Sequence, residues 1–414
     1  MAGNSKQRKE YFTPMQIGYI TNCVMPVNID SDSRWKLIEK SDPGKSGDPD
    51  IGVIPLERHG TIMGIIRRED IKKLDRNQHS LAARIFSKSS PSFIMPVHNV
   101  IDASSHITKV AEEGLKTIAW DNPGWYVVQH KHKYYGIVNL RQLIIYLQEI
   151  QSRDLTRAGE IQKTLLIQPE LEDSRFRYLS YNRMAHEVGG DWFKPLQINR
   201  DLYLFSCFDV AGKNISGSLV TMSLGACLAT LSLVSYHEGI TGRRKKDNPE
   251  QITSLVNNLI MTVNPPDVFV AGTLLYVNLY TELIEIYNCG LSPVIAFVPS
   301  GNNTIAYKNF KPNLPPLGLQ AELNPDPPQK IPISDGLRIL VYSDGLLDMS
   351  DINGERYGEE RVIDFFQNLH YIPDDDFSAF VDREINLWTK DTALADDITL
   401  CELRFGKAEP GGSR

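Results

Sequence analysis

The chain has 414 residues, a formal net charge of −7 and a charged fraction of 23%. This length predicts two or three domains. The negative charge argues against nucleic acid as the main partner and is compatible with binding divalent cations. The five cysteines include no Cys-x-x-Cys pair, so they predict buried free thiols in a reducing compartment and exclude a disulfide framework or zinc site.

The N-terminus is charged and lacks the apolar stretch of a signal peptide. No uninterrupted apolar run approaches about 18 residues, so no membrane span is expected. We therefore predict a cytoplasmic protein with flexible ends at 1–11 and 407–414.

The first third of the chain contains an internal repeat. The segment CVMPVNI at 23–29 returns as FIMPVHNV at 93–100, and TIMGIIRREDIKKL at 61–74 returns as KYYGIVNLRQLIIYL at 133–147. The first match is shifted by 70 residues and the second by 72, which indicates a duplication. Within each copy short strands alternate with helices, so each is predicted to be a small α/β unit.

These two copies, at about 12–78 and 85–148, resemble a pair of CBS (cystathionine-β-synthase-type) domains. In that family an aspartate in the closing helix holds the ribose of an adenine nucleotide, and Asp70 stands at that position. The resemblance implies a tandem CBS regulatory module over 12–148 with a possible adenine nucleotide at Asp70. Arg67 stands where the family has Ser or Thr, and the second copy lacks the acid. The alternative that Asp70 is only a charge on a helix surface stays open.

A helical connector is predicted to follow this module, over 149–172. From about 140 to 166, apolar residues recur near three-to-four spacing with charges between them, which indicates an amphipathic helix. Such a helix could form a seam with a second chain or pack on its own domain. Its place between two domains makes it the natural route for a signal.

Four acidic stretches stand out after residue 175. Each lies at the end of an apolar strand or in a glycine-rich turn beside one. The aspartates are Asp191 in HEVGGDWF, Asp209 in LYLFSCFDVAGKN, Asp344 in RILVYSDGLLD, and Asp396 and Asp397 in LADDITLCELRF. Any one of them alone is explained by a turn, because Asp caps the local backbone and Gly supplies positive φ. Strands of one sheet bring their ends together, so we expect these acids to converge.

Converging carboxylates repel one another unless a cation neutralises them. Oxygen ligands favour hard cations such as Mg²⁺ or Mn²⁺, and no His or Cys cluster with zinc spacing accompanies these acids. Several converging aspartates suit a two-metal site, in which the cations lie about 3.5–4 Å apart. We therefore predict that a metal ion is the partner charge of Asp344.

The order E-V-G-G-D, D-V-x-G-K, Y-S-D-G and D-D-I-T resembles that of the metal-dependent protein phosphatases of the PPM class, nearest to the bacterial SpoIIE/RsbU-like branch. The likeness spans about 158–405 in the right order. The implied fold class is α+β: an α/β/β/α sandwich of two antiparallel sheets over 173–406, preceded by the small α/β tandem CBS module. The period-two pattern of LLYVNLYTELIEIYNCG agrees locally, and NISGSLVTMSLGACLATLSLVSY is typical of a flanking helix.

The resemblance also implies which residues bind two Mn²⁺ or Mg²⁺ ions. Asp209 would bridge both metals, and the backbone carbonyl of Val210 would bind one of them. Asp191 would serve the second metal, directly or through water, and Asp344 would bind the first.

In the D-D-I-T motif, Asp396 is the first choice as a ligand and Asp397 the second. Lys213 stands where the family commonly has His, and it could attract phosphate or face water. His186 is interpreted as structural. Ser343 is interpreted in the same way, because no general-base histidine neighbours it in sequence.

The implied function is hydrolysis of phosphoserine or phosphothreonine on a partner protein by attack of a metal-activated water. By family analogy the substrate is a phosphorylated anti-sigma-factor antagonist, the CBS pair regulates the enzyme, and the chain forms a homodimer. The alternative is a non-catalytic adenine-nucleotide sensor or scaffold with a degenerate phosphatase fold. A two-metal nuclease would need a basic groove, which the net charge disfavours.

Overall fold

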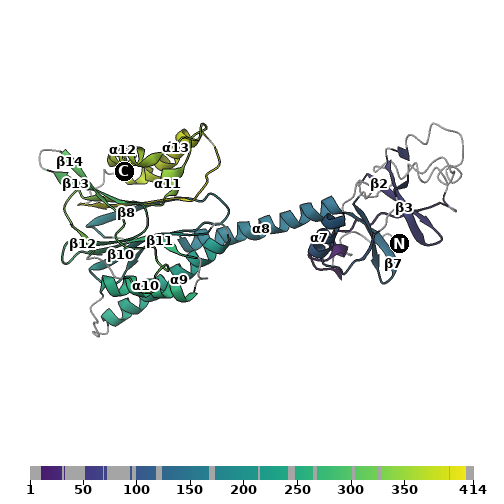
Figure 1. Ribbon diagram of the computed structural model, residues 1–414, viewed down its shortest axis with the longest axis horizontal. Helices are drawn as coiled ribbons and strands as arrows, with labels where there is room; N and C mark the ends of the chain where they lie inside the picture. Colours follow the sequence, from purple (N-terminus) through teal and green to yellow (C-terminus); the bar gives the residue numbers. More distant parts are fainter. Residues whose placement is uncertain are drawn as a thin grey trace, which may run out of the picture. The chain divides into compact units, whose positions relative to one another are not determined.

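The computed structural model describes residues 11–29, 32, 52–68, 70–71, 94–95, 99–117, 124–166, 173–212, 215–240, 248–263, 268–300, 304–323, 328–390 and 392–406. The chain divides into two compact units, Met1–Arg153 and Asp154–Arg414, which are described separately (Figure 1). The division falls within the predicted connector. The expected flexible ends lie outside the described residues, apart from Tyr11.

Unit 1 contains two small sheets, with strand orders β1-β2-β3-β4 and β5-β6-β7. The strands are β1 (Val27–Asn28), β2 (Val53–Arg58), β3 (Thr61–Arg67), β4 (Ile94–Met95), β5 (Asn99–Asp102), β6 (Trp125–His130) and β7 (Lys133–Asn139). The helices are α2 (Ile17–Ile20), α7 (Ile107–Thr117) and the first part of α8 (Leu140–Leu166).

The two sheets of unit 1 repeat one pattern. In each, a parallel pair (β1 with β2, β5 with β6) is followed by an antiparallel hairpin. The hairpins carry a bulge at the equivalent place, after Leu56 in β2 and after Val128 in β6. Strands β2 and β6 begin at 53 and 125, a shift of 72 residues. This regularity agrees with the predicted duplication. The Met-Pro-Val match, which is shifted by 70 residues, differs by two residues from the shift of 72 between the strands.

Each copy also lends a short segment to the sheet of the other. Met95 in β4 pairs with Ile65 in β3, and Asn22 forms an antiparallel bridge with Ile137 in β7. Ile65 and Ile137 are equivalent in the repeat, and they lie together in one small buried cluster. The two copies are therefore related by a reciprocal exchange, although their identification as CBS domains stays a prediction.

Unit 2 is built on two five-stranded antiparallel sheets, with orders β15-β12-β11-β10-β9 and β14-β13-β16-β17-β8. The strands are β8 (Phe176–Arg183), β9 (Asp191–Gln197), β10 (Leu202–Val210), β11 (Val270–Asn278), β12 (Leu283–Cys289), β13 (Val294–Ser300), β14 (Thr304–Phe310), β15 (Gln329–Pro332), β16 (Arg338–Tyr342) and β17 (Ile398–Phe405). The helices are α9 (Ile215–Ile240), α10 (Pro249–Val263), α11 (Gly345–Asp348), α12 (Gly358–Asn368) and α13 (Phe377–Thr389).

The two sheets stack face to face and the helices cover their outer faces (Figure 1). Helices α9 and α10 pack on the β9–β12 side, and α11, α12 and α13 pack on the other sheet. One large apolar core joins the sheets to α9 and α10, and a second lies beneath α12 and α13. The predicted sandwich of two antiparallel sheets flanked by helices is confirmed.

Helix α9 is apolar and long enough, over Ile215–Leu233, to pass a length-and-composition test for a membrane span, which the sequence analysis did not expect. In the structure it lies against the sheet. Leu224 and Leu228 are buried in the core, and a Cβ added at Gly225 would come within 2.1 Å of the Trp192 ring. These are the contacts predicted for a flanking helix of the sandwich.

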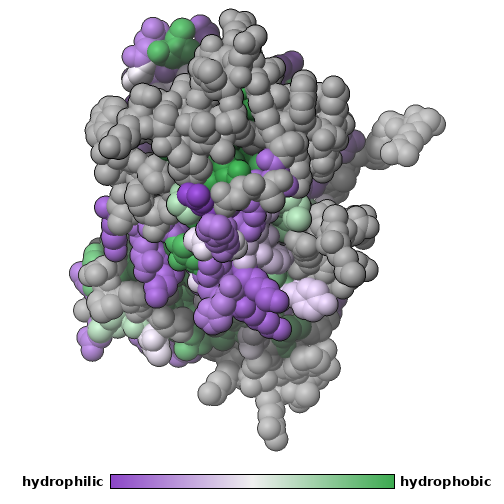
Figure 2. Space-filling view, turned by 90° about the vertical axis from the view of Figure 1, so that its right-hand side faces the viewer, coloured by the Kyte–Doolittle hydropathy of each residue, from purple (hydrophilic) through white to green (hydrophobic). Residues whose placement is uncertain are grey.

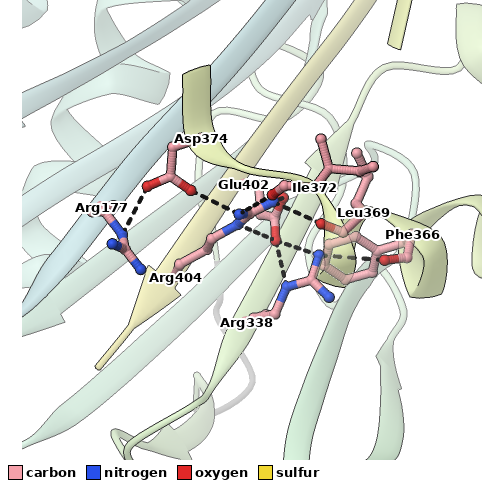
Figure 3. A network of polar contacts seen from close by, with 8 residues as sticks. All are labelled: Arg177, Arg338, Phe366, Leu369, Ile372, Asp374, Glu402 and Arg404. Carbon is pink, nitrogen blue, oxygen red and sulfur yellow. Dashed lines mark hydrogen bonds and ion pairs between the residues drawn. The ribbon is translucent and has the colours of Figure 1, made fainter. Parts of the chain in front are cut away.

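A buried network of ion pairs fastens the end of α12 to the second sheet (Figure 3). Glu402 in β17 is fully buried and accepts hydrogen bonds from Arg338 in β16 at 2.5 Å and from Arg404 at 3.0 Å. Arg404 also donates to Asp374 at 2.7 Å, and Arg177 pairs with the same carboxylate at 2.9 Å. Both Arg338 and Arg404 donate further to backbone carbonyls at or just after the end of α12.

Figure 2 shows the molecule from a second side, coloured by hydropathy. Among the coloured residues on this face, hydrophilic side chains prevail and the hydrophobic ones form small separate areas. Such a surface is typical of a chain in which 23% of residues are charged.

Candidate functional site

The first sheet places two of the predicted aspartates opposite each other. Asp191 opens β9 and Asp209 lies next to the end of β10; since the strands are antiparallel, the two residues are register partners. Asp191 is buried and Asp209 is half-buried. The short Gly189-Gly190 stretch leads the chain directly into this position.

The second sheet supplies the remaining aspartates, which also lie where the ends of two antiparallel strands meet. Strand β16 ends where its antiparallel neighbour β17 begins, and the amide of Ser343 donates to the carbonyl of Thr399 at 3.0 Å. Asp344 follows β16, and the Asp396–Asp397 pair precedes β17. Glycine is needed at position 345, because an added Cβ would lie 2.0 Å from the Asp397 carbonyl oxygen. The Ser-Asp-Gly ending of the strand is thus required by the close approach of the two segments.

These residues line one cavity of about 350 Å³. Its walls are His186, Val188, Gly190, Asp209, Val210, Ala211, Gly212, Phe269, Ala271, Gly290, Pro316, Asp344, Asp396 and Asp397. The cavity therefore joins acids from both sheets. Asp191, also a predicted ligand, is not among its lining residues and lies beside Asp209 as its register partner. Within the described part of the chain, no Lys or Arg is among the lining residues.

The crowding of acids raises their pKa values. Burial, followed by the charges of Asp344 and Asp396, raises the pKa of Asp209 to about 7. Burial and the Asp209 charge also hold the pKa of Asp191 well above its usual value. The site thus gathers several carboxylates whose ionised forms repel one another.

One hydrogen bond links the two sheets at the site. The hydroxyl of Thr399 in β17 donates to the carboxylate of Asp191 in β9, and both residues are buried. The amide of Thr399 in turn donates to the hydroxyl of Ser343 at 2.9 Å, and that hydroxyl donates to the Asp397 carbonyl at 3.1 Å. Ser343 is fully buried, so its interpretation as a structural strand residue agrees with these contacts.

Asp397 holds the loop that leads into Asp191. One of its carboxylate oxygens accepts from the Ala185 amide and the other from the Gly190 amide, both at 2.7 Å. Burial is the larger effect and raises the Asp397 pKa above its usual value, although these two bonds oppose it. With both oxygens engaged, Asp397 is an anchor, and Asp396, half-buried at the cavity wall, is better placed as a cation ligand.

The donor set fits hard divalent cations, because it consists of carboxylate oxygens and the Val210 segment. Among the described residues, no group of three or more His, Cys, Asp or Glu side chains lies close enough together, as placed, to hold a metal ion. The open, roomy arrangement suits cations that keep several water ligands, as Mg²⁺ does. The raised pKa of Asp209 points the same way, since a bound cation would relieve the repulsion that causes it.

The structure also brings in residues that the sequence analysis did not place at the site. His186, which was interpreted as structural, is exposed at the cavity wall, and Phe269 and Pro316 form an apolar side of it. Only the proximity of His186 to the E-V-G-G-D motif could have suggested its position. Lys213 lies outside the described residues.

Asp70, the predicted nucleotide ligand in unit 1, is 3% exposed. Its carboxylate accepts a hydrogen bond from Arg67 at 2.9 Å. The alternative that Asp70 is a helix-surface charge is therefore wrong. The nucleotide site itself stays a prediction.

Unit 2 is similar to known proteins in both sequence and fold. A family model described as Stage II sporulation protein E (SpoIIE) matches residues 199–406. Phosphoserine phosphatase RsbP of Bacillus subtilis (strain 168) is 25% identical over 197 residues, which is 47% of this chain and 45% of RsbP. The chain thus matches less than half the length of that relative.

Among solved structures, the SiaA-PP2C domain of Pseudomonas aeruginosa superposes with a TM-score of 0.50 at 20% identity, covering 63% of this chain and 98% of that one. A PP2C phosphatase domain with a regulatory fragment of SpoIIE from Bacillus subtilis gives a TM-score of 0.43 at 12% identity, covering 56% of this chain and 63% of that one. The first of these likenesses supports the PP2C-like fold of unit 2.

Proposed function

We propose that this chain, which belongs to the SpoIIE family of PPM-type serine phosphatases, hydrolyses phosphoserine or phosphothreonine on a partner protein. The observation that carries the proposal is the cavity where aspartates from both sheets meet. Phosphatases of this class depend on metal ions, and carboxylate oxygens are the ligands that Mg²⁺ and Mn²⁺ prefer.

The residues that would hold two Mn²⁺ or Mg²⁺ ions are those predicted from the sequence. They are Asp209, the backbone carbonyl of Val210, Asp344, Asp191 (directly or through water), and Asp396 ahead of Asp397. When bound, the cations would supply activation of water and neutralisation of the charge that grows on the phosphoryl oxygens.

The protein's own residues have three tasks around this set. Thr399 orients the Asp191 carboxylate by donating to it, and Asp397 fixes the loop before Asp191. His186 can donate an imidazole N–H toward the phosphoryl group from the cavity wall. Phe269 and Pro316 offer an apolar surface to the substrate residues beside the phosphorylated side chain.

The finer assignments rest on family analogy and on unit 1. The substrate would be a phosphorylated anti-sigma-factor antagonist, and the enzyme a cytoplasmic homodimer. The repeated units of the N-terminal part would act as a CBS pair that binds an adenine nucleotide near Asp70 and regulates the phosphatase. Helix α8 would carry that regulation, because it is one unbroken helix from Leu140 to Leu166.

A hydrolysis assay tests the proposal. The full chain is incubated with p-nitrophenyl phosphate, and separately with a phosphoserine protein, with and without Mn²⁺. We expect Mn²⁺-dependent release of phosphate that Asp209→Asn lowers by at least about a thousandfold. Asp375→Asn, an exposed aspartate of the turn after α12, is the matched control and should act as the wild type does. If the wild type releases no phosphate from either substrate, the sensor or scaffold alternative replaces the enzyme.

A further inference from the structure

The last turns of helix α8 hold the glycine loop of the site. Gln162 is 2% exposed, and its side-chain amide forms two hydrogen bonds with one residue of that loop. Its Nε2 donates to the Gly189 carbonyl at 2.7 Å, and its Oε1 accepts from the Gly189 amide at 3.0 Å. Gly189 has no side chain through which it could be held. The two bonds from Gln162 therefore hold its backbone N–H and carbonyl groups in place.

A glycine on the same helix permits this approach. A Cβ added at Gly159 would lie 2.0 Å from the carbonyl oxygen of Glu187, so the helix and the loop backbone are in direct contact there. Gly159 and Gln162 are three residues apart and lie on the same side of the helix. This face of α8 is therefore complementary to the loop. Gly159 allows the helix and the loop backbone to approach closely, and Gln162 forms the hydrogen bonds between them.

The loop leads straight to the proposed cation ligands. Gly190 follows Gly189, and its amide donates to Asp397 while its carbonyl accepts from the Thr221 hydroxyl at 2.6 Å. Asp191 comes next and faces Asp209. Two consecutive glycines have no rotamers to restrain them and wide backbone freedom. The path of the chain into Asp191 is thus determined by the polar groups that hold these peptides.

We infer that Gln162 is a positioning residue that sets the affinity of the site for divalent cations through its two bonds to Gly189. The inference deepens the proposed function and rests on it. Without the amide, two buried backbone groups of Gly189 lose their partners and the loop relaxes toward others. Asp191 and the Asp397-bound amide of Gly190 then move from the geometry that the cations need. Loss of a group that orients metal ligands typically weakens metal binding 10–100-fold.

Two variants disturb the contact between α8 and the loop in different ways. Gln162→Met keeps the size of the side chain and removes both hydrogen bonds. Gly159→Ala keeps Gln162 and pushes the Glu187 carbonyl. Gln151→Met makes the same exchange at an exposed position of α8 and serves as the matched control.

The measurement is Mn²⁺ binding to the full chain by isothermal titration calorimetry, with Mn²⁺ electron paramagnetic resonance as the second readout. Melting temperatures of the metal-free proteins are recorded beside them. For Gln162→Met we expect Mn²⁺ binding about 10–100-fold weaker and a matching rise in the Mn²⁺ concentration that half-activates hydrolysis. Activity at saturating Mn²⁺ should largely return. Gly159→Ala should shift binding in the same direction, and Gln151→Met should leave it unchanged.

The inference is overturned if Gln162→Met and Gly159→Ala bind Mn²⁺ as tightly as the wild type, even when their melting temperatures fall, because Gln162 is then only structural. A wild type that binds Mn²⁺ but hydrolyses no phosphoester overturns the proposed function and leaves the role of Gln162 to be decided by calorimetry. A wild type that binds no Mn²⁺ overturns both.

Discussion

Unit 2 contains two clusters of charged side chains that are built on opposite plans. In the network of Figure 3, Glu402 lies between Arg338 and Arg404, and Asp374 lies between Arg404 and Arg177, so every carboxylate there has a cationic partner. At the cavity, acids face acids, and the described lining residues include no Lys or Arg.

This difference distinguishes a charge cluster that stabilises the fold from one that is suited to binding a ligand. Burial lowers the pKa of the Arg338 guanidinium and Glu402 opposes that shift, so the pair compensates itself. Burial and neighbouring charge both raise the pKa of Asp209. A divalent cation bound among these carboxylates would relieve the repulsion that raises this pKa.

The largest expected effect comes from breaking the compensated cluster. Glu402→Gln leaves the buried Arg338 without its carboxylate, so we expect a loss of about 3–5 kcal/mol in the free energy of unfolding. Urea denaturation measures it. The control is Glu355→Gln, whose exposed pair with Arg361 should contribute less than about 1 kcal/mol. Equal losses from the two variants would contradict the view that the Figure 3 network is an interior ion pair of the fold.

The second effect is the stabilisation of the folded protein by a bound cation. Mn²⁺ that binds only the folded protein stabilises it by about 2.7 kcal/mol at one hundred times its dissociation constant. We therefore expect the melting temperature of the wild type to rise with Mn²⁺ concentration, and that of Asp209→Asn to stay flat. The melting temperature of Glu402→Gln should rise with Mn²⁺ as the wild type does, from a lower start, because its cation site is intact.

The third effect is the pH dependence of the metal-free protein. Burial and the neighbouring acids raise the pKa of folded Asp209 from the ordinary 3.8 of an aspartate to about 7. Between these values the folded state binds the proton that the unfolded state has released, so stability falls as pH rises from about 4 to 7. Burial is the largest cause of this raised pKa, and the charges of Asp344, Asp396 and Asp397 add to it.

Asp209→Asn removes the titrating group at the centre of this cluster. In EDTA at pH 8 we expect the variant to be more stable than the wild type by on the order of 1–3 kcal/mol, and its stability to change less between pH 5 and pH 8. Denaturation at the two pH values measures both quantities. A variant that is less stable than the wild type at pH 8 would show that the acids do not repel in the folded state.

Much of the acidic cluster could be predicted from sequence because strand ends are visible there. A run such as RILVY followed by Ser-Asp-Gly marks where a strand stops, and antiparallel neighbours meet at such ends. The register of the antiparallel strands then places these ends together: Asp191 is opposite Asp209, and Asp344 lies beside the start of β17. The sandwich was implied by the family resemblance, and the period-two alternation of the strands agreed with it locally.

The compensated cluster could not be predicted in this way. Arg338 and Glu402 are 64 residues apart, and neither has a sequence signature, since their meeting depends on how β16 and β17 pair. Gln162 was likewise hidden, because one amide in an amphipathic helix looks like a solvated residue until its partner at Gly189 is known. In unit 1 the repeat spacing was visible, but the exchange of Asn22 and β4 between the copies depends on tertiary pairing.

The smallest expected effect concerns the bond that joins the two sheets at the site. Thr399→Val keeps the β-branched shape and the strand but removes the hydroxyl that donates to Asp191. That donation lowers the Asp191 pKa, so its loss should raise it further. We expect a loss of about 1 kcal/mol in the free energy of unfolding and roughly tenfold weaker Mn²⁺ binding at pH 7.

Thr389→Val is the matched control, because Thr389 is equally buried but its hydroxyl donates only to a carbonyl of its own helix. Calorimetry at pH 7 and pH 8.5 separates the two variants. The Thr399→Val deficit in Mn²⁺ affinity should shrink at the higher pH, because a proton on Asp191 competes with the cation. If Thr399→Val binds Mn²⁺ as Thr389→Val does at both pH values, the bond between the sheets supports only the fold and the Asp191 carboxylate is not part of the cation site.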